Sequence, residues 1–464
     1  MAPLKITLQD VADKAGVHRA TAARAMHNAP NISKPPMKTR LAFLLAVTIA
    51  PILAAAPKPP AIPARTVSIT DFGARPDATT DNANAIQKAI NSVSGKGGCV
   101  TIPEGIFLSG PIQLASHVEL RLAKGATLRL LPYSENFPST NGRCLNFISA
   151  KDCTDIKISG EGTIDGQGAP WWPLSRANKL PNGRPQLITF NNCERVLCEN
   201  FTTLNPPNTH FSLRLCKDVT MRGLTLRAPG DSHNTDGINI SGKNYLIAAC
   251  NISTGDDNIV LNATPARNWN PPVTENIEVR DCIFGDGHGM SIGSHITGGV
   301  RGLLVENCSF NGTTAAIRMK SWPDAGGLVE NLVYRNLTVK GARYPVFISS
   351  YYPKEPKSPE LDKGAPARDG ATKPLWRNIL IENLAVADSQ NSIIIWGIPG
   401  QPITNLTIRN ATFATQEGAA IYNATKILLD NVKINSAKPP LLRTYQAHIQ
   451  STPELPVTKW SPAK

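Results

Sequence analysis

The chain has 464 residues and a formal net charge of +13, a length that allows one large domain or two to three ordinary ones. Aromatic residues are sparse at 6% and charge is ordinary at 18%, while glycine and proline are plentiful, which favours a turn-rich β protein over a helical one. A basic chain attracts polyanions, and charge alone does not choose among nucleic acid, acidic lipid and acidic polysaccharide.

Residues 1–36 carry the pattern of two short helices. Thr7-Leu8-Gln9-Asp10-Val11-Ala12 is followed by Ala15-Gly16-Val17, which predicts a helix-turn-helix with its turn at Gly16. The string resembles the DNA-binding headpiece of lactose-repressor-family regulators, whose second helix enters the major groove. It stops where that headpiece needs a third helix and a hinge. We therefore interpret it as a mis-called start or a fusion remnant, with a functional chimera that binds DNA through residues 5–30 as the alternative.

Residues 37–56 have the layout of a secretory signal peptide. A basic start precedes an apolar run over residues 41–53 and the small-residue string Ala54-Ala55-Ala56. The run is too short for a comfortable membrane span, so we expect an extracellular or periplasmic protein with no stable membrane anchor after cleavage. Translation from Met37 explains this layout most simply. Residues 57–64, rich in proline and alanine, are a predicted linker.

Residues 65–464 are predicted to form one domain. The apolar spacing after Asp81 is helical, and Asp81 is the expected N-cap of that helix. Short strands follow, almost without further helices. The helix would cover the open first coil of the strand-rich part and protect its edge.

The strands repeat along the domain. Runs similar to Val196-Leu197-Cys198-Glu199-Asn200-Phe201 begin again at Ile277, Leu303, Leu332, Ile379, Leu406 and Ile427. Their usual period lies in the range that signals a solenoid. Two or three short strands per period, each turning at Gly or Asn, predict the coils of a parallel β-helix. Stacked coils would place Asn above Asn and Cys above Cys.

The nine cysteines are scattered, and none shows zinc-binding spacing. Cys216, Cys250, Cys282 and Cys308 each lie in a strand-like run. We expect them to be buried as small apolar residues. One or two disulfides remain open for a protein in an oxidising compartment.

Four strings carry the chemistry, and they are Asn234-Thr235-Asp236-Gly237, Gly255-Asp256-Asp257, Gly287-His288-Gly289 and Arg318-Met319-Lys320. Their spacing by one or two repeats would bring them to one patch of the groove of a β-helix. Three carboxylates packed together cannot all ionise easily, so one pKa must rise. A carboxylic acid beside a carboxylate suits the acid–base cleavage of a glycosidic bond.

Local geometry supports the same patch. Neighbouring side chains of a regular strand point to opposite faces, so Asp256 and Asp257 meet only if the backbone bends, which Gly255 permits. Arg318 and Lys320 are two residues apart and would share a strand face. A planar guanidinium and an ammonium on one face can bind the carboxylate of an acidic sugar.

Calcium binding is the main alternative for the clustered acids, because carboxylates and backbone carbonyls hold that ion. Pectate lyases of the same architecture combine Asp-bound calcium with a basic side chain for elimination. His288, held between two glycines, is a poor calcium ligand and a good proton partner. The residues therefore favour hydrolysis, and we expect neither a metal nor another cofactor.

The third segment resembles the polygalacturonases of glycoside hydrolase family 28 over nearly all its length. Besides the four strings, it has Gly162-Thr163-Ile164-Asp165-Gly166-Gln167-Gly168, Arg184-Pro185 and the opening Asp71-Phe72-Gly73-Ala74. The resemblance implies a right-handed parallel β-helix and inverting hydrolysis of α-1,4-linked galacturonan in pectin. It implies an acidic polysaccharide as the partner, and we expect a monomer that does not bind nucleic acid.

The resemblance also implies roles for single residues. Asp256 would be the general acid, Asp236 and Asp257 would activate water, and His288 would support protonation of the acid. Asn234, Arg318 and Lys320 would bind the substrate.

Two positions depart from the family pattern. Asn239 stands where an acid is common, and Asn205-Pro206-Pro207-Asn208-Thr209-His210 varies another motif. Both leave open a related polymer such as rhamnogalacturonan.

Overall fold

The computed structural model describes residues 56–361 and 372–461, all within one compact unit. The helix-turn-helix-like segment, and the predicted signal peptide up to residue 55, lie outside these residues. The predicted linker has no regular secondary structure, and its Ala61 N–H donates to Asp155 Oδ1 at 2.9 Å. Among the described residues, no helix is long and apolar enough to cross a membrane.

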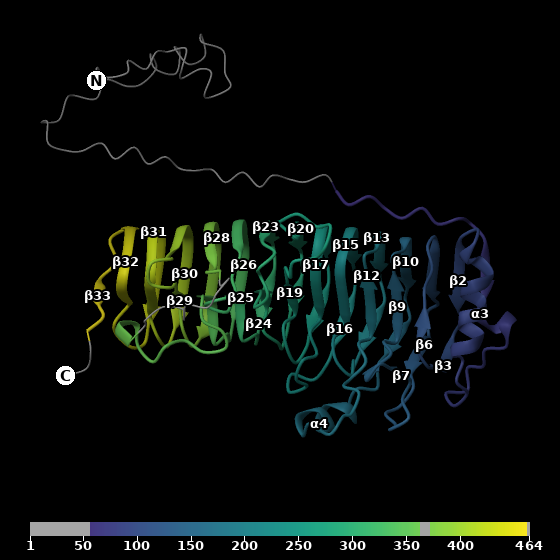
Figure 1. Ribbon diagram of the computed structural model, residues 1–464. Helices are drawn as coiled ribbons and strands as arrows, with labels where there is room; N and C mark the ends of the chain where they lie inside the picture. Colours follow the sequence, from purple (N-terminus) through teal and green to yellow (C-terminus); the bar gives the residue numbers. More distant parts are fainter. Residues whose placement is uncertain (1–55, 362–371, 462–464) are drawn as a thin grey trace, which may run out of the picture. The chain divides into compact units, whose positions relative to one another are not determined.

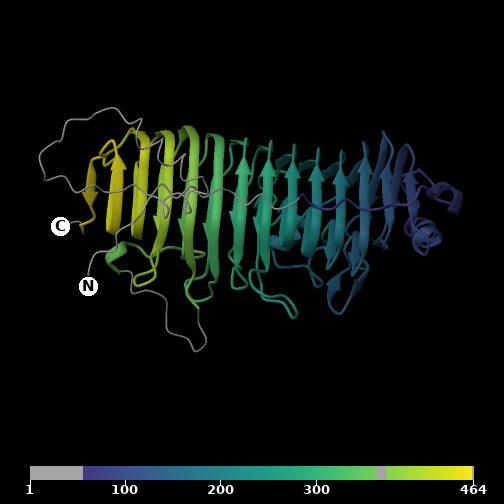
Figure 2. The same ribbon diagram turned by 90° about the horizontal axis from the view of Figure 1, so that it is seen from above.

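The described strands confirm the right-handed parallel β-helix. All but two of them join one parallel sheet that winds through successive coils, so that each strand pairs with its equivalent one coil further on. Figures 1 and 2 show the coils side by side from the α3 end to the β32 end. Each coil contributes to three stacks of strands, and the chain bends between the stacks.

The bounds of the elements follow this arrangement. The first stack contains β1 (Thr66–Ser68), β2 (Gly98–Ile102), β5 (Val118–Leu122), β10 (Thr154–Gly160), β13 (Glu194–Glu199), β20 (Thr274–Arg280) and β23 (Val300–Glu306). The second contains β3 (Gly105–Ser109), β6 (Ala126–Leu130), β11 (Thr163–Asp165), β14 (Thr202–Leu204), β16 (Thr225–Arg227), β18 (Asn251–Ser253), β21 (Ile283–Phe284) and β24 (Ser309–Asn311). The third contains β4 (Ile112–Gln113), β9 (Ile148–Lys151), β12 (Ile188–Asn191), β19 (Ile259–Leu261), β22 (Met290–Ile292), β25 (Ala315–Lys320), β27 (Tyr344–Ser349), β29 (Ile393–Trp396) and β33 (Val457–Lys459).

Seven longer strands take part in more than one stack, six of them in two and β31 in all three, and the remaining elements lie outside the stacks. The long strands are β15 (Phe211–Arg222), β17 (Ile238–Ala248), β26 (Leu328–Lys340), β28 (Leu375–Ser389), β30 (Ile403–Thr415), β31 (Ala419–Ser436) and β32 (Leu442–Thr452). The others are the helices α3 (Ala83–Ser94) and α4 (Trp171–Arg176), the 3₁₀ turns η1 (Ile69–Phe72) and η2 (Pro359–Leu361), and the antiparallel pair β7 (Ser139–Thr140) and β8 (Arg143–Cys144).

The repeats found in the sequence stack in one register. Ile277 pairs with Leu303, Leu303 with Leu332, and the series continues in the same way to Ile427. The long interval between Val196 and Ile277 holds two more coils, which begin at Val219 and Tyr245. The sequence pattern did not detect these coils, because Gly223 and Ala249 take the left-handed position after the strand that Asn takes in other coils.

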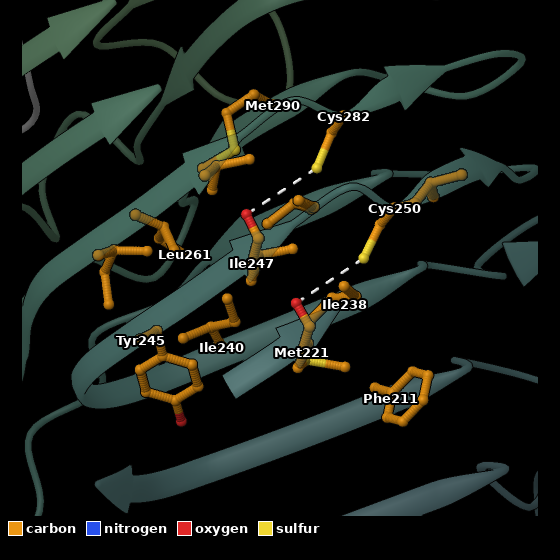
Figure 3. Close-up of a cluster of buried hydrophobic side chains, with 14 of the residues drawn as sticks. Phe211, Met221, Ile238, Ile240, Tyr245, Ile247, Cys250, Leu261, Cys282 and Met290 are labelled. Atoms are coloured by element: carbon orange, nitrogen blue, oxygen red, sulfur yellow. Dashed lines mark hydrogen bonds between the residues drawn. The ribbon is translucent and has the colours of Figure 1, made fainter. Parts of the chain in front are cut away.

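The interior is a continuous apolar column, part of which Figure 3 shows. Eight of the nine cysteines are buried and all nine are free thiols, so the expected burial is confirmed. Cys250 and Cys282 follow strand-ending residues with positive φ, and their thiols donate to the carbonyl oxygens of Met221 and Ile247 one coil back, both at 3.9 Å. Cys250, Cys282 and Cys308 thus lie at the bends and not within strands as the sequence had predicted.

Helix α3 covers the first coil as expected. It buries Ile86, Ala89, Ile90 and Val93 against that end of the column. The predicted N-cap was wrong by one residue, because Asn82 precedes the helix directly. Asp81 still stabilises the first turn, since its Oδ1 accepts from the Ala83 N–H at 2.9 Å.

Candidate active site

The fold brings all the predicted site residues together where the second stack bends into the third. Asn234 and Asp236 precede β17, Asp256 and Asp257 lie between β18 and β19, His288 lies between β21 and β22, and Arg318 and Lys320 belong to β25. The strands β17, β19, β22 and β25 are successive neighbours in the third stack. Residues from four coils therefore share one patch.

Asp257 is the buried anchor of this patch, with an exposed fraction of 4%. Its Oδ1 accepts from Ser291 Oγ at 2.5 Å and from Arg318 Nη1 at 2.7 Å, and its Oδ2 accepts from Lys320 Nζ at 2.9 Å. Burial alone would raise the pKa of Asp257, but Lys320, His288 and Arg318 hold it far below its usual range. Asp257 is therefore an anion, and both cations reach it from one strand face, as their spacing predicted.

His288 lies between the two neighbouring aspartates. Its Nδ1 is 3.0 Å from Asp256 Oδ1 and 3.6 Å from Asp257 Oδ1. Burial lowers the pKa of His288, but the two carboxylates outweigh it and raise the pKa to about 9 against the opposing charge of Arg318. At neutral pH the ring is therefore an imidazolium that donates to Asp256.

Asp256 has a second set of donors. The backbone N–H and the Nδ2 of Asn234 both lie 3.3 Å from Asp256 Oδ2. Burial favours the neutral form of Asp256, yet the hydrogen bond to His288 outweighs it and lowers the pKa. Asp256 is thus also ionised in the free protein.

Asp236 carries the raised pKa that crowding of the acids predicts. Burial and the negative charges of Asp256 and Asp257 raise the pKa of Asp236 to about 8. The sequence had predicted one such carboxyl without saying which, and the resemblance assigned the acid role to Asp256. In the free protein the neutral carboxyl is Asp236, because His288 protects the charge of Asp256.

Arg184 belongs to the site although the sequence marked it only as part of a family string. Its Nη2 donates to Asn234 Oδ1 at 2.9 Å, and its Nη1 donates to the carbonyl oxygens of Pro207 and His233 at 3.0 and 2.9 Å. Because Arg184 holds the amide oxygen of Asn234, the amide nitrogen faces Asp256. No spacing rule could reveal this contact, since Arg184 comes from a loop two coils away.

Small residues let the catalytic loops approach each other. A Cβ on Gly255 would overlap the carbonyl oxygen of Ser232, so only glycine fits there. Thr235 Oγ1 accepts from the Gly255 N–H at 2.9 Å and donates to the Ser232 carbonyl at 2.7 Å. These contacts tie the loop of Asp236 to the bend of Asp256, which confirms the bend that Gly255 predicted.

The acids fit a divalent cation poorly. Ligand atoms of Asp256, Asp257 and His288 lie within 4.8 Å of one another. The carboxylate of Asp257 already accepts from Arg318 and Lys320, and those fixed charges oppose a metal ion at the same oxygens. The arrangement suits an anionic ligand beside proton-transferring groups.

An aromatic pair lies beside Lys320. Lys320 Nζ lies 5.3 Å from the ring centroid of Tyr352, which packs edge to face against Trp322. Trp322 is 37% exposed. Tyr352 begins a long loop whose course the sequence did not predict.

Clustered carboxylates, an imidazolium and two cations on an open parallel β-helix define a polysaccharide-cleaving enzyme of the β-helix class. The family model for glycosyl hydrolases family 28 matches residues 96–366. The chain belongs to this family and is a glycoside hydrolase.

Individual relatives agree with this family. The chain is 34% identical to an endo-polygalacturonase of Pectobacterium carotovorum subsp. carotovorum over 367 residues, which cover 74% of this chain and 86% of the relative. A solved polygalacturonase from Erwinia carotovora ssp. carotovora superposes with a TM-score of 0.67 at 31% identity and covers 81% of this chain and 98% of its own. A hyperthermoactive exopolygalacturonase from Thermotoga maritima gives a TM-score of 0.66 at 25% identity, with coverage of 85% and 94%.

Proposed function

We propose that the protein hydrolyses the α-1,4-galacturonosidic bonds of polygalacturonate, the acidic chain of pectin, with inversion of configuration. The printed activities of its relatives support this substrate. The observation that carries the proposal is the pair Arg318 and Lys320 beside three clustered carboxyl groups. A uronate needs a cationic partner for its carboxylate, and its glycosidic bond needs an acid and a base.

In this mechanism Asp256 protonates the leaving oxygen, while Asp236 and Asp257 activate the attacking water. Arg318 and Lys320 bind the sugar carboxylate, and Asn234 orients the acid and contacts the substrate. Arg318 has five N–H donors and uses Nη1 for its hydrogen bond to Asp257, so the donors on Nε and Nη2 can bind the sugar carboxylate.

Substrate binding moves the proton of the acid cluster to the place where it is needed. In the free protein Asp236 holds it, since its pKa is raised to about 8 while His288 lowers the pKa of Asp256. A uronate bound beside Asp256 adds a negative charge close to this carboxylate, which raises the pKa of Asp256. One proton shared by two neighbouring carboxyls can then pass from Asp236 to Asp256, leaving Asp236 as a base.

Assays on polygalacturonate separate hydrolysis from the other chemistries. We expect new reducing ends, no rise in ultraviolet absorbance, and the same rate with and without chelator. Proton NMR of the first product should show the β-anomer at the new reducing end. Chelator-sensitive release with rising absorbance would instead identify a lyase, and binding without new ends would identify a non-catalytic glycan binder. Rhamnogalacturonan and oligogalacturonides as substrates define the polymer and the cleavage pattern.

Action outside the cell is part of this proposal. The signal-peptide layout of residues 37–56 supports it, and N-terminal sequencing of the exported protein tests it. A protein that stays inside the cell would contradict action outside it, and an exported protein that keeps residues 1–36 would contradict cleavage of the predicted signal peptide. The expected monomer stays a prediction, and light scattering of the purified protein tests it.

A further inference from the structure

Asn258 is a polar residue in the interior of the coil. It directly follows Asp257, has an exposed fraction of 0%, and precedes the apolar strand β19. A buried amide costs stability unless its donors and acceptor are paired. Its presence inside an apolar column therefore calls for a specific set of partners.

Those partners lie on both sides of His288. Asn258 Nδ2 donates to the carbonyl oxygen of Asp286 at 2.8 Å, and Asn258 Oδ1 accepts from the Gly289 N–H at 2.7 Å. The same Nδ2 also lies 3.2 Å from Thr254 Oγ1 within its own bend. One side chain thus fixes the backbone just before and just after the Gly287-His288 pair.

Gly287 allows this close approach. Its φ is +124°, and a Cβ there would lie 2.7 Å from both Nδ2 and Oδ1 of Asn258. The His288 N–H in turn donates to the carbonyl oxygen of Asp256 at 2.9 Å. The backbone of His288 is therefore held by Asn258 from inside the coil and by Asp256 from the previous coil.

We propose that Asn258 is a positioning residue that holds the imidazole of His288 against Asp256. The proposal rests on the proposed function only for its effect on turnover. Asn258 is shielded from the groove, so it acts through the loop and touches no substrate. Loss of its two bonds lets the loop of residues 286–289 shift, and the 3.0 Å contact between His288 Nδ1 and Asp256 Oδ1 lengthens.

The variant Asn258→Leu removes the bonds while it keeps similar volume. We expect kcat on polygalacturonate to fall by about 10²-fold with little change in KM, because displacing a reacting group by about 1 Å costs that much. We also expect the pKa of His288, about 9 in the native protein, to fall in the variant. The groups that face the ring are Asp256, Asp257 and Arg318, and the substitution leaves all three in place.

Asn423 offers a matched control. It is 2% exposed, and its Nδ2 donates to the Gly397 carbonyl oxygen at 3.1 Å between two later coils. Asn423 has a φ of +49°, so Asn423→Leu also adds strain and should lower the melting temperature at least as much as Asn258→Leu does. It should leave kcat and the titration of His288 unchanged.

NMR of the protein with ¹³C-labelled histidine measures that titration without any substrate. It therefore reports on Asn258 even if the proposed activity is absent. Equal titration of His288 in the wild type and in a folded Asn258→Leu variant would overturn the proposal. So would equal losses of kcat in the Asn258 and Asn423 variants.

Asn258→Asp keeps the shape of the side chain and provides a second test of the proposal if the leucine variant does not fold. A protonated carboxyl can donate to the Asp286 carbonyl and accept from the Gly289 N–H, whereas a carboxylate can only accept. Burial raises the pKa of a carboxyl, so the variant should approach wild-type kcat near pH 5. The ratio of wild-type to variant kcat should then grow toward pH 8, and a ratio independent of pH would count against the proposal.

Discussion

Two bends of the same coils stack similar side chains with opposite results. The amides at one bend satisfy each other, and the carboxyl groups at the other repel each other. At the bend after the first stack, a ladder of asparagines runs through Asn307, Asn336, Asn383, Asn410 and Asn431. Each Nδ2 donates to the Oδ1 of the residue one coil back, and each residue adopts the positive φ that asparagine tolerates. An amide is both donor and acceptor, so identical residues satisfy one another.

The acid cluster at the bend into the third stack cannot do this. Ionised carboxylates accept only, so Asp236, Asp256 and Asp257 repel one another when coils stack. Asp236 responds by keeping its proton, and Asp257 requires Lys320 and a guanidinium. The asparagine ladder therefore stabilises the solenoid, whereas the clustered acids of the active site lower its stability.

The largest expected effect is the loss of turnover in Asp256→Asn. The amide keeps the shape and the contact with Asn234 but cannot donate a proton to the leaving oxygen. We expect kcat to fall by about 10²–10⁴-fold, the usual contribution of a general acid, while oligogalacturonide binding persists. Initial rates and isothermal titration calorimetry measure the two quantities. A variant that retains more than about a tenth of the activity would refute the acid role.

The second effect concerns the cation that holds the cluster together. Lys320→Met leaves Asp257 buried with less compensation, and breaking a buried ion pair costs roughly 3–5 kcal/mol. We expect a loss near the lower end, because Arg318 and Ser291 still donate to Asp257. Urea unfolding measures the free energy of unfolding.

Lys438→Met is the control for that loss. Lys438 pairs with Glu417 at 2.9 Å on the surface, and its side chain is 63% exposed. Exposed pairs contribute about 0–1 kcal/mol. Equal losses in the two variants would show that the buried cation has no special role.

The third effect is a change in the pH dependence of stability in Asp236→Asn. The pKa of Asp236 is about 8 in the folded protein, well above the ordinary 3.8. The folded state therefore binds a proton that the unfolded chain releases, so this contribution is complete below about pH 4 and declines toward pH 8.

The difference in urea midpoints between the wild type and the variant from pH 4.5 to 6 isolates this group, because buried His210, whose pKa is lowered to about 3, titrates in the same window in both proteins. His288 contributes with the same sign only above its ordinary pKa of 6.5, and the depressed aspartates titrate below the window. We expect the wild type to lose up to roughly 1.4 kcal/mol per pH unit from Asp236, and the variant to lack that slope. Parallel curves would mean that the proton resides elsewhere.

The sequence predicted the coils and the meeting of the site residues because both depend on period. Stacking at a fixed register brings Asp236, Asp257 and Arg318 together whatever the details of the loops. The coils at Val219 and Tyr245 escaped because glycine or alanine replaces asparagine at their turns.

Features that depend on side-chain direction could not be predicted in this way. Which carboxyl keeps the proton depends on the orientation of His288, and the orientation of Asn234 depends on Arg184. Both contacts join side chains from different coils. The period brings such residues near each other, but it does not give the direction of their side chains.

The smallest expected effect is a loss of stability in variants of Asn383. These variants separate the contribution of the amide hydrogen bonds from that of the left-handed backbone. Asn383 donates to Asn336 at 2.9 Å, accepts from Asn410 at 3.4 Å and has a φ of +54°. Asn383→Gly removes the amide bonds but suits the positive φ, so we expect a loss of about 1 kcal/mol. Asn383→Ala adds the strain of a Cβ in the left-handed region, about 1–2 kcal/mol more.

Neither variant should change kcat, because the ladder lies at a different bend from the acids. Melting temperatures and initial rates of the two variants test both statements. If Gly and Ala cost the same, the ladder bonds alone stabilise the bend, and the preference for asparagine there has no conformational part. If either variant loses turnover, the two bends are coupled, and the separation between a stabilising ladder and a destabilising acid cluster does not hold.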